Sequence, residues 1–177
     1  MLGFIPALEV QAAEATGRVT ISYTLTRLSR IASNQLAIWI EDADGRYVRT
    51  LFVTDFTGRR AGWKRRPQTL PTWLQAAGVK EARQGDIDSI SAATPASGGH
   101  TAVWDLKDRH GKAVAPGTYR YRIEANISWD NTAMWTGTIE VGGGRTTSRA
   151  GVVYTPRDAE KLGTLISEVS ALYEPAR

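Results

Sequence analysis

The chain has 177 residues, a length that suits one domain with a sizeable core, and it carries 22 basic and 18 acidic side chains for a formal net charge of +4. It has no cysteine, which excludes disulfides, thiol chemistry and metals held by cysteine. The basic residues are spread along the chain apart from one dense run between Arg59 and Arg66, so the charge predicts no nucleic-acid partner, and no apolar run reaches the ~18 residues of a membrane-spanning helix.

Residues 1–16 are typical of a leader or of the remnant of a signal peptide. Leu2 to Val10 is mostly apolar, and small residues suited to signal-peptide cleavage follow over 12–15. The basic segment that opens a complete signal is missing, and polar residues interrupt the apolar part. On balance the sequence favours export to a periplasmic or otherwise extracytosolic location.

Alternating apolar and polar side chains over 17–28 predict the first strand of the domain. Apolar residues return at every second position of 35–41, and Asp44-Gly45 then predicts a hairpin turn because both residues tolerate positive φ. The return strand is expected over 46–54. Calcium loops also begin with Asp-x-Asp-Gly, but large apolar side chains stand where further oxygen ligands are needed, so the hairpin interpretation is favoured.

Residues 55–99 form a long insertion and loop between strands, and insertions of this length are commonly functional or cover a core edge. A short helix is expected over 72–78, ended by its glycine. The insertion also holds the dense basic run. Its candidate contacts for a phosphate or for a partner protein are Trp63, Lys64, Arg65 and Arg66, and the alternative is a solvated basic loop.

The most distinctive stretch is Asp88-Ser89-Ile90-Ser91-Ala92-Ala93-Thr94. It resembles the acceptor motif of proteins that carry FMN covalently on a threonine: an aspartate, two free positions, serine or threonine, usually glycine, then alanine and threonine. The residues that fit are Asp88, Ser91, Ala93 and Thr94, and Ala92 replaces the usual glycine. The resemblance implies that a separate flavin transferase esterifies FMN to Thr94, with Asp88 and Ser91 serving recognition or loop orientation. The alternative is a plain surface loop of small residues over 89–99.

A second resemblance covers the segment after His100. Val103-Trp104-Asp105, the turn Pro116-Gly117 and the alternation that follows it up to Val141 resemble the immunoglobulin-like domain of flagellar hook-capping proteins. Together with the hairpin, the insertion and the Asp-x-x-Ser-x-Ala-Thr-Pro loop, these features make 19–141 similar to a family of predicted periplasmic proteins of unknown function. That similarity implies export and association with extracytosolic redox or metal-uptake gene sets.

The fold prediction is therefore all-β: an immunoglobulin/fibronectin-like antiparallel β-sandwich over 17–141, with a long insertion and a C-terminal appendage. The appendage, 142–177, is expected to be a linker followed by a strand or a helix. Thr155-Pro156 is typical of a helix start, and apolar residues keep helical spacing from Leu162 onward. Periodicity alone favours a helix, although Val169, Ala171 and Tyr173 also alternate. The family resemblance shifts the prediction towards a strand over 165–173.

The sequence offers no recognisable catalytic constellation. Its two histidines, His100 at the start of a strand and His110 in a predicted turn, indicate neither a metal cluster nor a nucleophile with its base. One hypothesis is a non-catalytic carrier or accessory protein of an extracytosolic flavin system that passes electrons to a membrane redox protein. The other is a periplasmic protein-binding or assembly module with no cofactor. An enzyme of unrecognised type is the least favoured.

Overall fold

Strand β1 (Arg18–Leu25) buries every second side chain, as its alternating sequence predicts. The computed structural model describes residues 13–29, 33–82 and 84–177, so the leader prediction lies outside the described residues up to position 12. β1 pairs antiparallel with β5 (Gly98–Trp104) on one side and with β10 (Ile166–Glu174) on the other. These three strands begin the first of two sheets.

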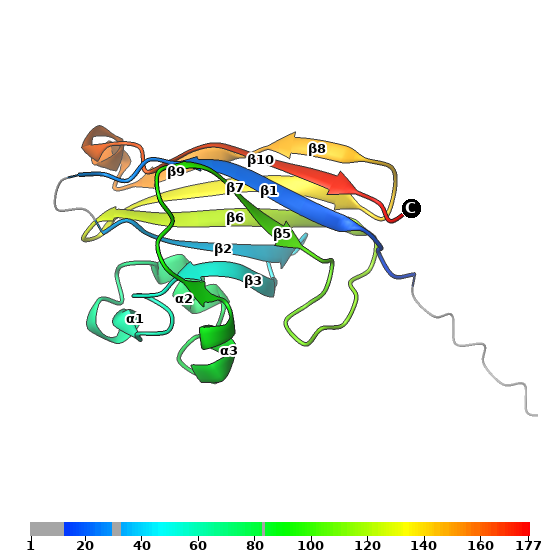
Figure 1. Ribbon diagram of the computed structural model, residues 1–177, viewed down its shortest axis with the longest axis horizontal. Helices are drawn as coiled ribbons and strands as arrows, with labels where there is room; N and C mark the ends of the chain where they lie inside the picture. The colour runs from blue at the N-terminus through cyan, green and yellow to red at the C-terminus, as the bar shows by residue number, and fades with distance from the viewer. Residues whose placement is uncertain (1–12, 30–32, 83) are drawn as a thin grey trace, which may run out of the picture.

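The two sheets pack against each other as a sandwich (Figure 1). The four-stranded sheet has the order β5-β1-β10-β8, and the six-stranded sheet has the order β4-β3-β2-β6-β7-β9. The remaining strands are β2 (Gln35–Asp42), β3 (Tyr47–Thr54), β4 (Ser91–Ala92), β6 (Gly117–Ser128), β7 (Asn131–Val141), β8 (Thr146–Arg149) and β9 (Gly151–Thr155). The predicted β-sandwich and the β2–β3 hairpin are confirmed, with β4 as a parallel addition beside β3.

The main core lies between the sheets. Leu36, Ile38 and Ile40 of β2 enter it from the six-stranded sheet, and every second residue of β1 enters it from the other. Trp104 and Tyr119 meet there edge to face, with ring centroids 4.9 Å apart. Such aromatic pairs add to the stabilisation from burial alone.

A second core lies on the outer face of the six-stranded sheet. The insertion covers this face with α1 (Gly62–Arg65), α2 (Pro71–Ala76) and α3 (Gln84–Ser89). Trp39 of β2 packs there with Trp73 and Ile87. Because both faces of β2 are covered, nearly all of its side chains are buried although the sequence alternates. The helix expected over 72–78 is α2, whereas the segment expected as a plain loop over 89–99 contains the end of α3, β4 and the start of β5.

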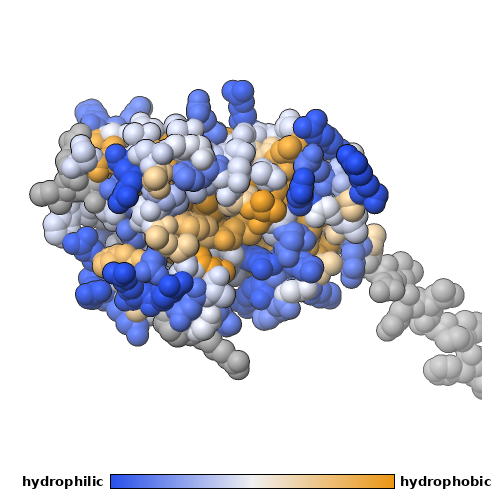
Figure 2. All heavy atoms as spheres, viewed as in Figure 1, coloured by the Kyte–Doolittle hydropathy of each residue, from blue (hydrophilic) through white to orange (hydrophobic). Residues whose placement is uncertain are grey.

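The C-terminal segment is part of the sandwich rather than an appendage. β8 and β10 complete the four-stranded sheet, and β9 forms an edge of the six-stranded sheet. Helical structure is limited to the 3-10 helix η1 (Arg157–Leu162). Residues 166–174 form a strand and not a helix because β10 pairs with both β1 and β8. Alternate residues of this strand, such as Val169 and Tyr173, lie in the main core. Figure 2 shows apolar atoms near the middle of the face over β1 and β5, framed by hydrophilic side chains.

Candidate functional site

Thr94 lies in the loop that joins β4 of the six-stranded sheet to β5 of the four-stranded sheet (Figure 1). The chain reaches this loop from α3, in which Asp88 is half-buried. β4 then runs parallel to the end of β3, and the N–H of Asp55 donates to the carbonyl oxygen of Ala92 at 2.7 Å. The first part of the 88–94 motif is therefore fixed to β3, and Thr94 follows directly after the fixed part.

Ser91 is a buried connector between α3 and β4. Its hydroxyl donates to the carbonyl oxygen of Ile87 at 2.7 Å. The turn after β3 packs so closely against it that a Cβ added to Gly58 would stand 2.1 Å from Ser91 Oγ. This glycine is needed for close approach, because no larger side chain fits between the turn and Ser91.

The loop around Thr94 is tied at its far side as well. The N–H of Arg27 donates to Ser97 Oγ at 2.9 Å, and His100 Nε2 lies 2.7 Å from the carbonyl oxygen of Ala96. The imidazole of His100 also lies beside the Tyr23 ring, with centroids 5.7 Å apart. Thr94 is half-buried and Ala93 is exposed. The loop thus carries small side chains at the surface. Its backbone is fixed by the β3–β4 pairing before Thr94 and by the bonds of Ala96 and Ser97 after it.

Two arginines of the turn after β3 bond to the residues that hold the start of this loop. Arg59 Nη2 donates to the carbonyl oxygen of Ser91 at 2.9 Å. Its Nε lies 3.4 Å from Asp55 Oδ1, and Arg60 Nε donates to Asp55 Oδ2 at 2.9 Å. The basic run predicted from the sequence includes both arginines. The bond from Arg59 to Ser91 was not predicted, because it depends on the parallel β3–β4 pairing, for which the sequence gives no periodic signal.

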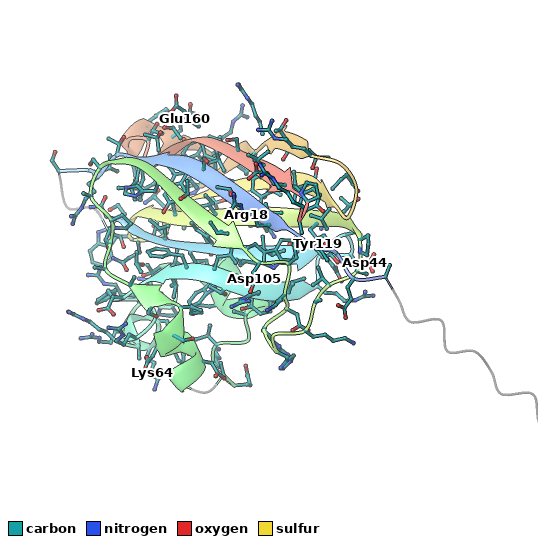
Figure 3. The ribbon with its side chains drawn as sticks, turned by 45° about the vertical axis from the view of Figure 1, so that its right-hand side comes forward. Arg18, Asp44, Lys64, Asp105, Tyr119 and Glu160 are labelled. Carbon is teal, nitrogen blue, oxygen red and sulfur yellow. The ribbon has the colours of Figure 1, made fainter. Side chains whose placement is uncertain are left out.

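The basic residues predicted as contacts lie over aromatic rings. Lys64 Nζ is 5.4 Å from the centroid of Trp63, and the guanidinium of Arg65 is 5.6 Å from that of Phe56. Arg66 lies 5.3 Å from the ring of Trp129, in the turn between β6 and β7. Figure 3 places Lys64 and Asp44 at opposite ends of the molecule. These cation–π pairs hold the exposed charges at the end of the sandwich where β3 finishes.

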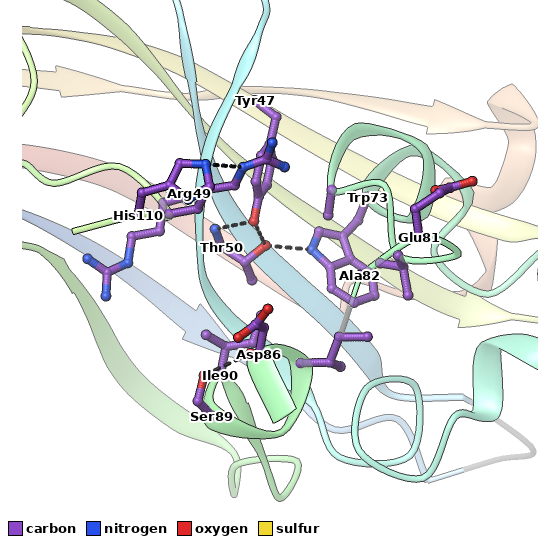
Figure 4. A pocket seen from close by; sticks show the side chains of 14 residues that line it. Tyr47, Arg49, Thr50, Trp73, Glu81, Ala82, Asp86, Ser89, Ile90 and His110 are labelled. Atoms are coloured by element: carbon purple, nitrogen blue, oxygen red, sulfur yellow. Dashed lines mark hydrogen bonds between the residues drawn. The ribbon is translucent and has the colours of Figure 1, made fainter. Parts of the chain in front are cut away.

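A cavity of about 400 Å³ lies between β3, the insertion and the turn at 108–111 (Figure 4). Trp73 Nε1 donates to Thr50 Oγ1 at 2.9 Å, and the Tyr47 hydroxyl lies 2.8 Å from the same oxygen. Burial raises the pKa of Tyr47 above its ordinary value of 10.0. The volume suits a small ligand, but the polar groups at the floor bond to one another.

The wall of this cavity is assembled from segments far apart in the sequence. Ser89 and Ile90 of the motif line it, as do Arg109 and His110 of the turn at 108–111. Arg109 lies 6.0 Å from the Tyr47 ring centroid. The sequence did not indicate this cavity, since none of its segments carries a ligand-binding pattern by itself.

Other classes of site are not found in the part of the chain that the structure describes. Within residues 13–29, 33–82 and 84–177, no group of three histidine, aspartate or glutamate side chains could hold a metal ion. None of the described helices is long and apolar enough to span a membrane.

Comparison with known proteins identifies the family. The family described as "Predicted periplasmic protein (DUF2271)" matches residues 17–154, which include the whole insertion and the 88–94 motif. No curated protein and no solved structure matches the chain. The match covers most of the sandwich, and it agrees with the resemblance found for 19–141. The chain belongs to this family of predicted periplasmic proteins.

Proposed function

We propose that this periplasmic protein is a non-catalytic carrier or accessory component of an extracytosolic flavin redox system, with FMN esterified to Thr94. The observation that carries the proposal is the position of the acceptor-like motif. Thr94 leaves a fixed strand, stands in a loop of small residues and is half-exposed at the end of the sandwich. A transferase active site could receive such a loop without displacing a packed element.

The attachment would be a phosphoryl transfer performed by a separate flavin transferase that binds FAD and a metal. The Thr94 hydroxyl oxygen would attack the phosphorus of the FMN half of FAD and form a P–O bond. The P–O bond to the AMP half would break, AMP would leave, and the hydroxyl proton would pass to a base of the transferase. This step involves no oxidation or reduction. Once attached, the flavin supplies one- or two-electron transfer to a membrane redox partner.

The other motif residues would act by position. Ser91 holds α3 to β4, so its role is to orient the loop, and Asp88 is proposed as a recognition element on α3. Ala93 keeps the residue before Thr94 small. Trp63, Lys64, Arg65 and Arg66 remain the proposed contacts for a phosphate or a partner.

The test is the intact mass of the protein after co-expression with an exported flavin transferase. Wild type should gain the mass of one FMN less one water, and the flavin fluorescence should stay with the chain after denaturation. Thr94→Ala should stay unmodified, and Thr94→Ser, which keeps a hydroxyl, should be modified. An unmodified wild-type chain would overturn the proposal for that transferase.

A periplasmic binding or assembly module with no cofactor is the second candidate function, and the sheet edges favour it. Val103 on edge strand β5 is 55% exposed and Val153 on edge strand β9 is 67% exposed. Exposed apolar edge strands are sites where another chain can add a strand. Val103→Lys and Val153→Lys should each abolish such pairing, detected as loss of a periplasmic crosslink, whereas neither change should alter flavin attachment.

A further inference from the structure

Three turns meet at one end of the six-stranded sheet. Ala92 pairs with Thr54 at the end of β3, and β2 begins beside that end at Gln35. Gln35 pairs in turn with Asn126, near the end of β6. The Thr94 loop, the turn after β3 and the β6–β7 turn therefore share this end, while the Asp44 turn lies at the opposite end (Figure 3).

One segment at this end is strongly basic. Segment 55–66 carries five basic side chains and one acidic one, a net charge of +4 that equals the formal net charge of all 177 residues. Asp55, the one acidic residue in the segment, pairs with Arg59 and Arg60. Lys64, Arg65 and Arg66 are exposed. A local excess of one sign attracts a partner of the opposite sign and speeds its association.

An exposed tryptophan stands in the same surface. Trp129 is 62% exposed and occupies the two-residue turn between β6 and β7 with a φ of +51°. Glycine, asparagine and aspartate are the residues that favour this conformation, and a bulky aromatic side chain adopts it at a cost in free energy. The fold does not need the indole for its core, because most of the ring is in solvent. A strained, exposed aromatic residue is a reason to look for a binding role.

The tryptophan and the cations form one surface. Arg66 lies 5.3 Å from the Trp129 ring, and a shallow hollow beside it is lined by Ser33, Gln35, Phe56, Arg65 and Arg66. Tryptophan and arginine are the residue types that most often dominate protein–protein binding energy. We call the surface formed by Arg65, Arg66 and Trp129 the basic end surface.

We infer that the basic end surface docks the flavin transferase, through an acidic protein surface around the entrance of its active site. The inference rests on the proposed function of Thr94. A transferase that takes Thr94 into its active site must cover the end of the sandwich around it, and this end carries the basic end surface. Complementary charge would steer the transferase, and Trp129 with the hollow beside it would fix the docked orientation.

The experiment measures the rate of FMN attachment against the concentration of this protein, with purified transferase and FAD. Arg66→Glu and Trp129→Asn should each lower the rate at limiting acceptor by roughly tenfold or more, which corresponds to at least ~1.4 kcal/mol. The maximal rate at saturating acceptor should change little. Added salt should lower the attachment rate of wild type more than that of Arg66→Glu. The variant has already lost the attraction between Arg66 and the acidic surface that salt would screen.

Two controls separate docking from folding and from general charge. Arg145→Glu makes the same change of charge at an exposed site in the turn between β7 and β8, at the opposite end, and should keep the wild-type rate. Trp129→Asn places a favoured residue in the turn, so its melting temperature should equal or exceed that of wild type. If Trp129 stabilised the fold, the melting temperature of Trp129→Asn would be lower than that of wild type.

The outcomes separate failure of the docking surface from failure of the flavin proposal. Wild-type rates for both variants, with FMN on the wild-type chain, would overturn the docking surface and leave the flavin proposal standing. No FMN on the wild-type chain would overturn both. Cosedimentation with phosphatidylglycerol vesicles that is lost in Arg66→Glu, with unchanged FMN attachment, would assign the surface to a membrane and overturn the inference.

Discussion

Glu124 of β6 ties the insertion to the sheet by accepting the backbone N–H of Trp73, in the first turn of α2, at 2.8 Å. The N–H of Thr72 donates to the other carboxylate oxygen at 3.2 Å. The start of a helix has unpaired N–H groups, and α2 has no side-chain cap of its own. A buried carboxylate from a different element therefore does what a capping residue does in most helices.

Burial of Glu124 makes stability depend on pH. Desolvation raises the pKa of Glu124 above its ordinary value of 4.5 and outweighs the opposing N–H bonds and the charge of Arg122. A raised folded-state pKa means that the folded protein binds the proton more tightly than the unfolded chain does. The contribution of protonated Glu124 to the free energy of unfolding is complete below pH 4.5. It is lost as pH rises through the folded-state pKa.

The measurement is urea unfolding of wild type and Glu124→Gln between pH 4 and pH 8. The difference in unfolding free energy between the two should change across the lower part of this range, with wild type losing stability relative to the variant as pH rises. Desolvation of Asp108 is outweighed by N–H bonds from Lys112 and His110, which lower its pKa, so this carboxyl titrates below the window. A difference that stays constant with pH would contradict the raised pKa of Glu124.

Gly58 and Ser91 should couple strongly. Gly58→Ala places a methyl group against Ser91 Oγ and Val53 and should destabilise the fold by roughly 1–3 kcal/mol. Ser91→Ala removes the bond to Ile87 and should cost about 0.5–1.5 kcal/mol. The double variant relieves part of the clash, so its loss should be smaller than the sum. Thermal unfolding of all four proteins tests this, and strict additivity would show that the turn moves away instead.

The ion pair between Glu41 and Arg122 should matter more than the pairs at the surface. Glu41 is buried, Arg122 Nη1 lies 3.1 Å from it, and Trp39 Nε1 donates to it at 2.8 Å. Arg122→Met leaves a buried carboxylate without its counter-charge and should cost roughly 3–5 kcal/mol.

Two further variants test whether burial is the cause. Glu41→Gln combined with Arg122→Met should recover most of the loss, because no charge is then left unpaired. Arg18→Met breaks the exposed pair with Glu174 and should change the unfolding free energy by less than ~1 kcal/mol. Equal losses for the buried and the exposed pair would contradict the argument.

Ala92→Gly should speed flavin attachment. Ala92 is exposed and occupies the position where the acceptor motif usually has glycine, so the change removes little packing and adds backbone freedom next to the loop. The expected result is a higher rate of FMN incorporation at the same transferase concentration. Ala92→Val serves as the opposite change and should slow it. The reverse order would show that the motif position is not read by the transferase.

The sandwich could be predicted from sequence because its strands keep a two-residue period. β1 is the clearest case, since it alternates along its whole length and lies with one face in the core. The C-terminal strand was ambiguous because Leu162, Leu165 and Ile166 also have helical spacing. Pairing with β1 and β8 selects the strand. Such pairing joins residues that are far apart in the chain, so no local pattern reports it.

The site could be predicted only in part for the same reason. The motif marked Thr94 and Ser91, but the arginine that bonds to Ser91 comes from a turn more than thirty residues earlier. The sequence alone predicts a core or sheet-surface position for Trp129, because its neighbours along the chain belong to strands. Its exposure follows from its place at the tip of a hairpin, which depends on where β6 ends.

The loop that bears Thr94 is one of the connections that cross between the two layers of the sandwich. One end of the Thr94 loop is joined to β4 and the other to β5, so the conformation of the loop depends on how the two layers pack against each other. A group attached to Thr94 would take its orientation from the sandwich as a whole, and lengthening the crossover by even one residue would loosen that orientation while leaving both layers intact.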